Sequence, residues 1–292
     1  MLTYLFAFFL APFQDFMFMR HALVACLALA LGCGPVGVLL VLRRMSLVGD
    51  ALSHAVLPGA ALGFLISGLS LFAMTIGGFV AGLVVALLAG ALTRLTTVRE
   101  DASFAALYLI SLALGVLLVS WRGSNIDLIH VLFGTILAVD DAALILVAAI
   151  TTATLLILAI IYRPLIVECV DPGFLRAVGG SGATMHFLLL GLVVLNLVAG
   201  FRALGTLMAV GMMMVPAVSA RFWGKQVWSL ALAAVVIAML SGYVGLLLSF
   251  HANLPSGPSI ILTAGLCYLL SVVFGVHGSI YGRHRKSEHL TG

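Results

Sequence analysis

Charged residues are scarce in this chain: Lys, Arg, Asp and Glu make up 8% of its 292 residues, whereas 63% are hydrophobic. A soluble domain carries about 25% charged residues. So little charge cannot cover a water-facing surface, which excludes a soluble globular protein. The composition therefore predicts a chain whose solvent is the lipid bilayer.

Several signatures of chemistry are also missing. The four cysteines show no CxxC spacing, and three of them lie in apolar runs, where cysteine behaves as a small hydrophobic residue. The phosphate-binding pattern GxxxxGK[ST] does not occur, so any ATPase must be another chain. HExxH is absent and no GxSxG stands in an apolar run, which argues against an intramembrane protease. We expect no catalytic residue and no permanently bound cofactor.

Long apolar runs dominate what is present. A membrane-spanning helix needs about 20 mostly apolar residues. The sequence predicts nine crossings, near residues 21–42, 47–68, 71–93, 102–120, 141–162, 184–201, 203–220, 227–250 and 258–280. The pair 184–201 and 203–220 is hardly separated, so the expected fold class is all-α and polytopic, with about eight or nine transmembrane helices.

The positive charges of the short loops predict the orientation. With nine alternating crossings, only Arg20, Arg122 and Arg202 of the 14 Lys and Arg residues fall on one side of the membrane, which we take as the outside. The net charge of +4 therefore reflects topology and does not imply nucleic-acid binding. We expect a bacterial cytoplasmic (inner) membrane protein.

The organisation expected along the chain is simple. Residues 1–18, rich in phenylalanine, form an interfacial segment; residues 19–280 form the transmembrane domain; and residues 281–292 form a basic cytoplasmic tail.

One polar group interrupts the second predicted span, in the run GDALSHAVLPG (49–59). Asp50, Ser53 and His54 stand at i, i+3 and i+4, so a helix places them on one face. A carboxylate and an imidazole one turn apart can hold a divalent cation such as zinc or manganese. Pro58 and Gly59 follow, and both can break the helix.

A second interpretation of Asp50 stays open at this stage. Aspartate is a good N-cap, and Asp50 stands close to the start of the span, so it can simply begin the helix while His54 lies near the headgroups. Ionisable residues inside a membrane are rare and usually functional, which keeps the metal site in view.

The run RRMSLVGDALSHAVLPGAALGF resembles the signature of the integral-membrane permeases of bacterial ABC transporters for zinc and manganese. Three further stretches match in order: DLIHVLFGTILAV (127–139), RALGTLMAVGMMMVPAVSAR (202–221) and LPSGPSIIL (254–262). The similarity covers residues 20–280 and implies a bundle like that of the vitamin-importer class of ABC permeases.

The resemblance also implies a function and partners. It implies a permease that imports zinc, possibly manganese, by alternating access, as one of two identical copies, with a cytoplasmic ATP-binding subunit and an extracytoplasmic metal-binding protein. Asp50 and His54 would contact the ion, and Ser53 would assist. The family commonly has Asp two residues before the proline of the last motif, where this chain has Asn253, so Asn253 or the nearby His251 is the expected substitute. The donor set favours zinc slightly.

The longest loop between predicted spans on the cytoplasmic side includes Asp171-Pro172-Gly173-Phe174-Leu175-Arg176. Asp171 and Pro172 suit the start of a short helix, and Gly179-Gly180 suits its end. In ABC permeases such a helix docks on the ATPase, so the resemblance implies a coupling segment at about residues 171–183.

A different class of function also fits the residues alone. A secondary transporter or channel for divalent cations would equally place Asp and His inside a membrane. The sequence shows no paired repeats with interrupted helices, which disfavours it. Co-purification with an ATPase separates this alternative from the importer.

Overall fold

The structure is a computed structural model that describes residues 8–281 except 69, 98 and 122–138. Its described residues are almost entirely helical and contain no strand. The helices are α2 (Ala11–Asp15), α3 (Met17–Leu42), α4 (Val48–Ser67), α5 (Leu71–Leu95), α6 (Glu100–Trp121), α8 (Asp141–Val170), α9 (Pro172–Ala177), α10 (Gly182–Leu204), α11 (Thr206–Ala220), α12 (Val227–Ala252) and α13 (Ser256–Phe274).

Eight of these described helices are long and apolar enough to cross a membrane, which confirms the all-α polytopic class. The ninth expected span, 203–220, is the shorter helix α11. The basic tail lies outside the described residues apart from Tyr281, as do residues 127–138 of the second matching stretch.

Helix α11 is short because it runs inside the bundle. Met208, in its first turn, lies against Gly257 at the start of α13, and Ala217 packs beside Gly37 of α3. The side chains of Met212 and Met213 are fully buried. Since α11 is covered by protein, the thickness of the lipid core does not fix its length.

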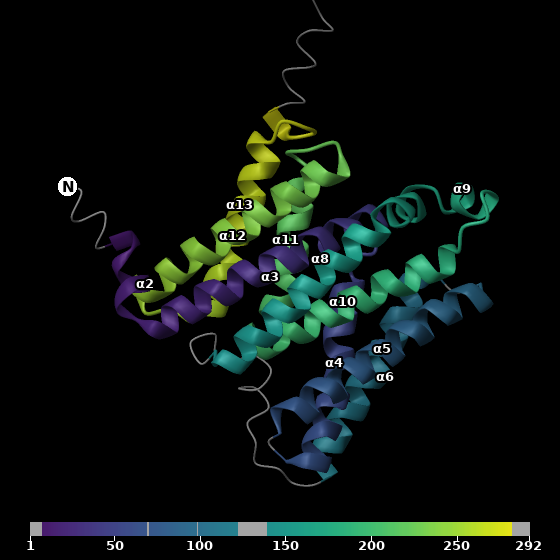
Figure 1. Ribbon diagram of the computed structural model, residues 1–292, viewed down its shortest axis with the longest axis horizontal. Helices are drawn as coiled ribbons and strands as arrows, with labels where there is room; N and C mark the ends of the chain where they lie inside the picture. The colour runs from purple at the N-terminus through teal and green to yellow at the C-terminus, as the bar shows by residue number, and fades with distance from the viewer. Residues whose placement is uncertain (1–7, 69, 98, 122–138, 282–292) are drawn as a thin grey trace, which may run out of the picture.

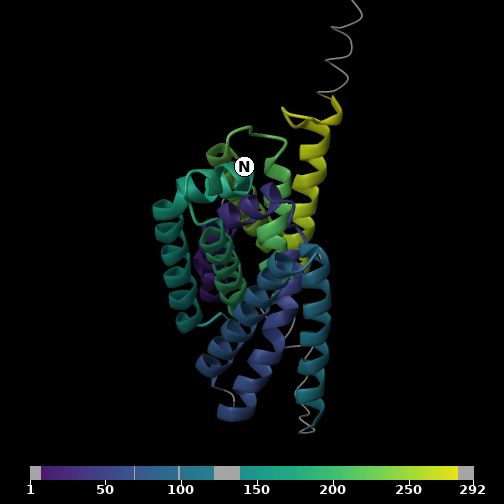
Figure 2. The same cartoon turned by 90° about the vertical axis from the view of Figure 1, so that its right-hand side faces the viewer.

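The long helix α3 forms the centre of the bundle and contacts α8, α10, α11 and α12 (Figure 1). Helices α4, α5 and α6 pack together on one side of it, and α12 and α13 lie on another (Figures 1 and 2). The fully buried face of α3 includes small residues, such as Ala22, Ala25 and Ala30, which let neighbouring helices approach closely.

Helix α4 continues through Pro58 and Gly59 as one helix, so the break that these residues can cause does not occur. Gly59 instead allows close packing: a Cβ there would stand 2.0 Å from the carbonyl oxygen of Gly77 on α5. The small-residue spacing of Gly78 and Gly82 serves the same purpose, since both contact side chains of neighbouring helices at under 3.0 Å from a built Cβ.

The N-terminal aromatic segment packs on the end of α12. The Phe8 ring stacks on His251 at 4.0 Å between centroids, and Tyr243 donates a hydrogen bond to the Phe9 carbonyl over 2.9 Å. The start of α3 and the end of α12 therefore lie at the same end of the bundle. The opposite end gathers the ends of α3 and α8 and the starts of α6 and α10, which is the arrangement that alternating crossings require.

Candidate metal site

The turn before α4 decides the position of Asp50. Arg44 adopts a left-handed backbone (φ 59°), and the N–H of Met45 bonds the carbonyl of Leu40 over 2.9 Å, which closes a tight turn. The N-cap of α4 is Leu47, whose side chain makes no capping bond. The N-cap interpretation of Asp50 is therefore wrong: Asp50 lies inside the first turn, where a helix still favours a negative charge.

Asp50 and His54 form the pair that their spacing predicts. The Asp50 Oδ1 atom lies 3.8 Å from the His54 Nε2 atom, with 63% of the aspartate side chain and 35% of the histidine side chain exposed. The other imidazole nitrogen, Nδ1, is buried and has no hydrogen-bond partner among the described residues. A cation shared with Asp50 would therefore bind Nε2, the nitrogen that faces the carboxylate.

Helix α6 covers one side of this pair. The ring of Tyr108 lies 5.8 Å from the ring of His54, and Ser111 donates a hydrogen bond to the carbonyl of Ala55 over 3.4 Å. Pro58 packs on Gly115 one helical turn further along. These contacts hold α4 against α6 and fix the position of His54.

Ser53 has a local partner. Its hydroxyl donates to the carbonyl oxygen of Asp50 over 2.7 Å, and the side chain is buried. Serine commonly makes this bond to its own helix.

A second aspartate–histidine pair provides a comparison. Asp141 Oδ1 lies 3.5 Å from His21 Nε2, and the His21 Nδ1 atom lies 3.2 Å from the carbonyl oxygen of Val139. Both nitrogens of His21 are therefore engaged. The contact of His21 with Asp141 joins α3 to α8, whereas Asp50 and His54 lie together on one helix.

The expected substitutes near the last motif lie elsewhere. Asn253 is the exposed C-cap of α12 in a left-handed conformation (φ 52°), and His251 bonds the carbonyl of Phe8 over 3.0 Å. No hydrogen bond, ion pair or ring contact of the described part joins either residue to α4. Within that part, no group of three or more His, Cys, Asp and Glu side chains stands ready to hold a metal ion.

The predicted short helix after the fifth long span is present as α9. The Asp171 carboxylate accepts a hydrogen bond from the N–H of Phe174 over 2.9 Å, and Gly179 (φ 80°) follows the end of the helix. Leu175 is buried and anchors α9, whereas the Phe174 side chain is exposed. The helix thus presents an apolar side chain away from the bundle.

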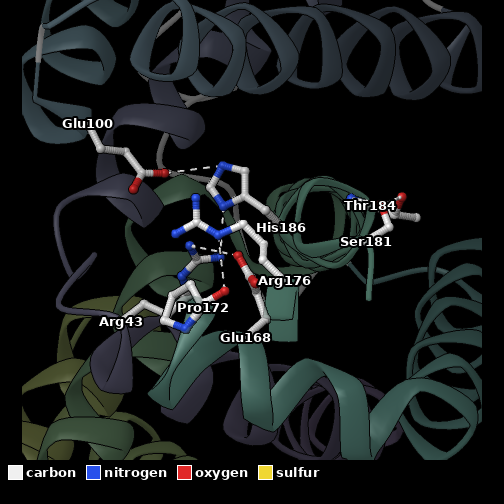
Figure 3. Close-up of polar contacts among 8 residues, drawn as sticks. All are labelled: Arg43, Glu100, Glu168, Pro172, Arg176, Ser181, Thr184 and His186. Atoms are coloured by element: carbon white, nitrogen blue, oxygen red, sulfur yellow. Dashed lines mark hydrogen bonds and ion pairs between the residues drawn. The ribbon is translucent and has the colours of Figure 1, made fainter. Parts of the chain in front are cut away.

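A largely buried polar cluster next to α9, which Figure 3 shows, was not predicted from the sequence. Arg43 Nη1 lies 2.7 Å from His186 Nδ1, and Arg43 Nη2 lies 3.8 Å from Glu168 Oε1. His186 Nε2 lies 3.2 Å from Glu100 Oε1. The four residues come from α10, α8, α6 and the C-cap of α3, so only the fold brings them together.

A cavity of about 440 Å³ adjoins this cluster. The four cluster residues line it together with Thr93, Ser181 and the α9 residues Pro172 and Arg176. Arg176 donates from Nε to the carbonyl of Pro172 over 3.2 Å.

Comparison with known proteins shows the family to which the chain belongs. The model of the ABC 3 transport family matches residues 15–275. The manganese import system permease protein ScaB of Streptococcus parasanguinis is 33% identical over 96% of this chain and 97% of its own length. The chelated iron transport system membrane protein YfeD of Yersinia pestis is 30% identical over 94% of this chain and 90% of its own.

A solved structure has the same fold. PsaBC from Streptococcus pneumoniae, in complex with Fab, superposes with a TM-score of 0.82 at 31% identity, covering 96% of this chain and 98% of that one. The fold and the matches define a polytopic permease of the ABC type for metal import. The chain belongs to the ABC 3 transport family and is a multi-pass protein of the cytoplasmic membrane.

Proposed function

We propose that this permease imports manganese and that Asp50 and His54 contact the ion on its way. The Asp50–His54 pair carries the proposal, because its carboxylate is exposed and the Nε2 atom of its imidazole faces that carboxylate, so one cation can lie between them. Manganese accepts carboxylate oxygen and imidazole nitrogen. The donor set slightly favours zinc, but the relative named for manganese supports manganese as the cargo. The relative named for iron also points to a transition metal as the transported ion.

One copy of the chain offers too few ligands. Asp50 and His54 supply two donors, whereas manganese usually takes about six and zinc about four. We propose that two copies associate about a two-fold axis, so that each pair has a symmetry mate and water completes the shell. An exposed carboxylate on the first turn of a membrane helix fits such an interface, because lipid would solvate its charge poorly.

Energy has to come from another chain. The sequence lacks a phosphate-binding loop, so we propose that a separate cytoplasmic ATP-binding subunit docks on α9, with Asp171 and Pro172 starting the helix and Phe174 exposed on it. The permease itself catalyses no covalent step. An extracytoplasmic metal-binding protein would deliver the ion at the opposite end of the bundle, where the turn with Asn253 lies.

Uptake of radioactive manganese by the reconstituted complex tests the proposal. Asp50→Asn and His54→Gln should each lower uptake at least about tenfold, since even groups that only support a metal ligand are worth ~10–100-fold in affinity. Asp141→Asn is the matched control, because it removes the carboxylate of the other aspartate–histidine pair. Near-normal uptake by both site variants in assembled complexes would refute the assignment, and uptake of zinc but not manganese by the wild type would correct the cargo.

A further inference from the structure

We propose that Glu168 is a switch point that links movement of α9 to the α3–α4 turn, by exchanging its ion-pair partner between Arg43 and Arg176. The inference rests on the proposed function, because it requires the ATPase to act on α9. It makes Glu168, Arg43 and His186 positioning residues for transport, although none of them touches the ion.

The first step is the link between α9 and Glu168. Asp171 is at once the C-cap of α8 and the N-cap of α9, so the two helices share one residue. Glu168 stands three residues before it, in the last turn of α8, with only 4% of its side chain exposed. A displacement of α9 therefore moves the carboxylate of Glu168 directly.

The second step is the link between Glu168 and the turn. Arg43, its ion-pair partner, is the C-cap residue of α3. The tight turn that follows leads into α4, and Met45 in that turn is buried. Asp50 lies in the first turn of α4. A shift of Arg43 therefore moves Asp50 and His54.

The third step concerns His186, which keeps Arg43 in place. A guanidinium can only donate hydrogen bonds, so the Nδ1 atom of His186 must accept from Arg43. The proton of the neutral ring then sits on Nε2 and faces Glu100. This assignment gives a chain of polar contacts from Arg43 at the end of α3, through His186 of α10, to Glu100 of α6. It requires the imidazole of His186 to be neutral.

Glu168 can pair with Arg176 because only one of its two carboxylate oxygens faces Arg43. Its Oε1 atom faces Arg43, whereas Oε2 is buried without a hydrogen-bond partner in the described part of the chain. Arg176 of α9 lines the same cavity of about 440 Å³ and, among the described residues, donates from Nε to the backbone carbonyl of Pro172 (Figure 3). A buried carboxylate with one free oxygen and two arginines beside one cavity has two discrete arrangements, which conformational coupling requires.

Gly182 leaves the space that this carboxylate occupies. A Cβ at Gly182 would lie 2.4 Å from Glu168 Oε2, so an alanine there must displace the carboxylate while leaving every charge in the chain. Gly191, on the same helix, has no atom within 4 Å of a built Cβ and provides the matched control.

The test measures manganese transported per ATP hydrolysed by the reconstituted complex. Glu168→Gln and Gly182→Ala should lower this ratio about tenfold, a typical coupling between two sites. ATP hydrolysis and co-purification with the ATPase should remain, because Glu168 is buried away from the docking surface. Gly191→Ala should keep the wild-type ratio, as should Arg163→Gln, which removes an exposed arginine of α8.

An unchanged ratio in assembled Gly182→Ala and Glu168→Gln complexes would overturn the proposal. If Glu168→Gln fails to assemble, the comparison of Gly182→Ala with Gly191→Ala decides alone. Asp50→Asn separates this inference from the proposed function: normal uptake in that variant removes the metal assignment, whereas loss of coupling in Gly182→Ala supports the switch independently.

Discussion

Two aspartate–histidine pairs in this chain have similar distances and different chemistry. In both pairs a carboxylate oxygen lies within 4 Å of a histidine Nε2 atom. The pair on α4 leaves the second nitrogen of His54 without a protein partner, whereas Val139 engages that of His21. The pairs also differ in placement, since Asp50 and His54 lie one turn apart on α4, whereas the contact of His21 with Asp141 joins α3 to α8.

Ser53 provides a prediction at this scale. Its hydroxyl donates to the carbonyl of Asp50 over 2.7 Å, and the side chain is buried. We therefore expect that Ser53 does not contact the metal ion. Ser53→Ala should keep manganese uptake within about fivefold of the wild type, as expected where a net hydrogen bond is worth about 1 kcal/mol or less. A loss as large as that of Asp50→Asn would instead make Ser53 a contact of the ion.

Spacing along one helix predicted the Asp50–His54 pair, because residues four apart share a face whatever surrounds them. It could not predict the cluster of Arg43, Glu168 and His186. Arg43 and His186 are 143 positions apart, and only the packing of α3, α8 and α10 brings them together. Their burial is also unexpected, since Arg and Glu at the ends of spans usually face water.

Close packing at glycine is the main feature at the scale of helices. Gly59 and Gly77 face each other across α4 and α5, and a Cβ on either would meet the other's carbonyl oxygen at 2.0–2.2 Å. Backbone cannot move aside as a flexible side chain can. This contact holds α4, and therefore Asp50 and His54, against its neighbour.

Gly59→Ala should consequently destabilise the protein by about 1–3 kcal/mol, the usual cost of overpacking. The measurement is the midpoint of thermal unfolding in detergent. Gly265→Ala is the control, because a Cβ there meets nothing within 4 Å. Equal midpoints for the two variants would show that α4 and α5 pack less closely than described.

The apolar runs predicted the long helices, and Asp171 predicted the start of α9, since its carboxylate accepts a hydrogen bond from the N–H of Phe174. Two features of the helices could not be predicted from the sequence and became clear only in the folded structure. Pro58 stays inside α4, since the helix continues through it in close contact with α6. The length of α11 depends on its burial, which apolar composition alone does not reveal.

For the whole molecule, burial is uneven across the described spans. Helices α3 and α10 are mostly buried, whereas α5, α6, α8 and α13 leave most of their surface uncovered. Lipid or a second copy can cover such surfaces, and an isologous contact would use the same face twice. Composition predicted the membrane setting, but which outer helices meet a partner is a property of the assembly.

The central claim is that the imidazole of His54 binds the transported ion. Electron spin-echo envelope modulation of the manganese-loaded complex measures this directly, because a coordinated histidine nitrogen modulates the echo. The account predicts nitrogen modulation in the wild type and in His21→Gln, and its loss in His54→Gln. Modulation that persists in His54→Gln would contradict the account.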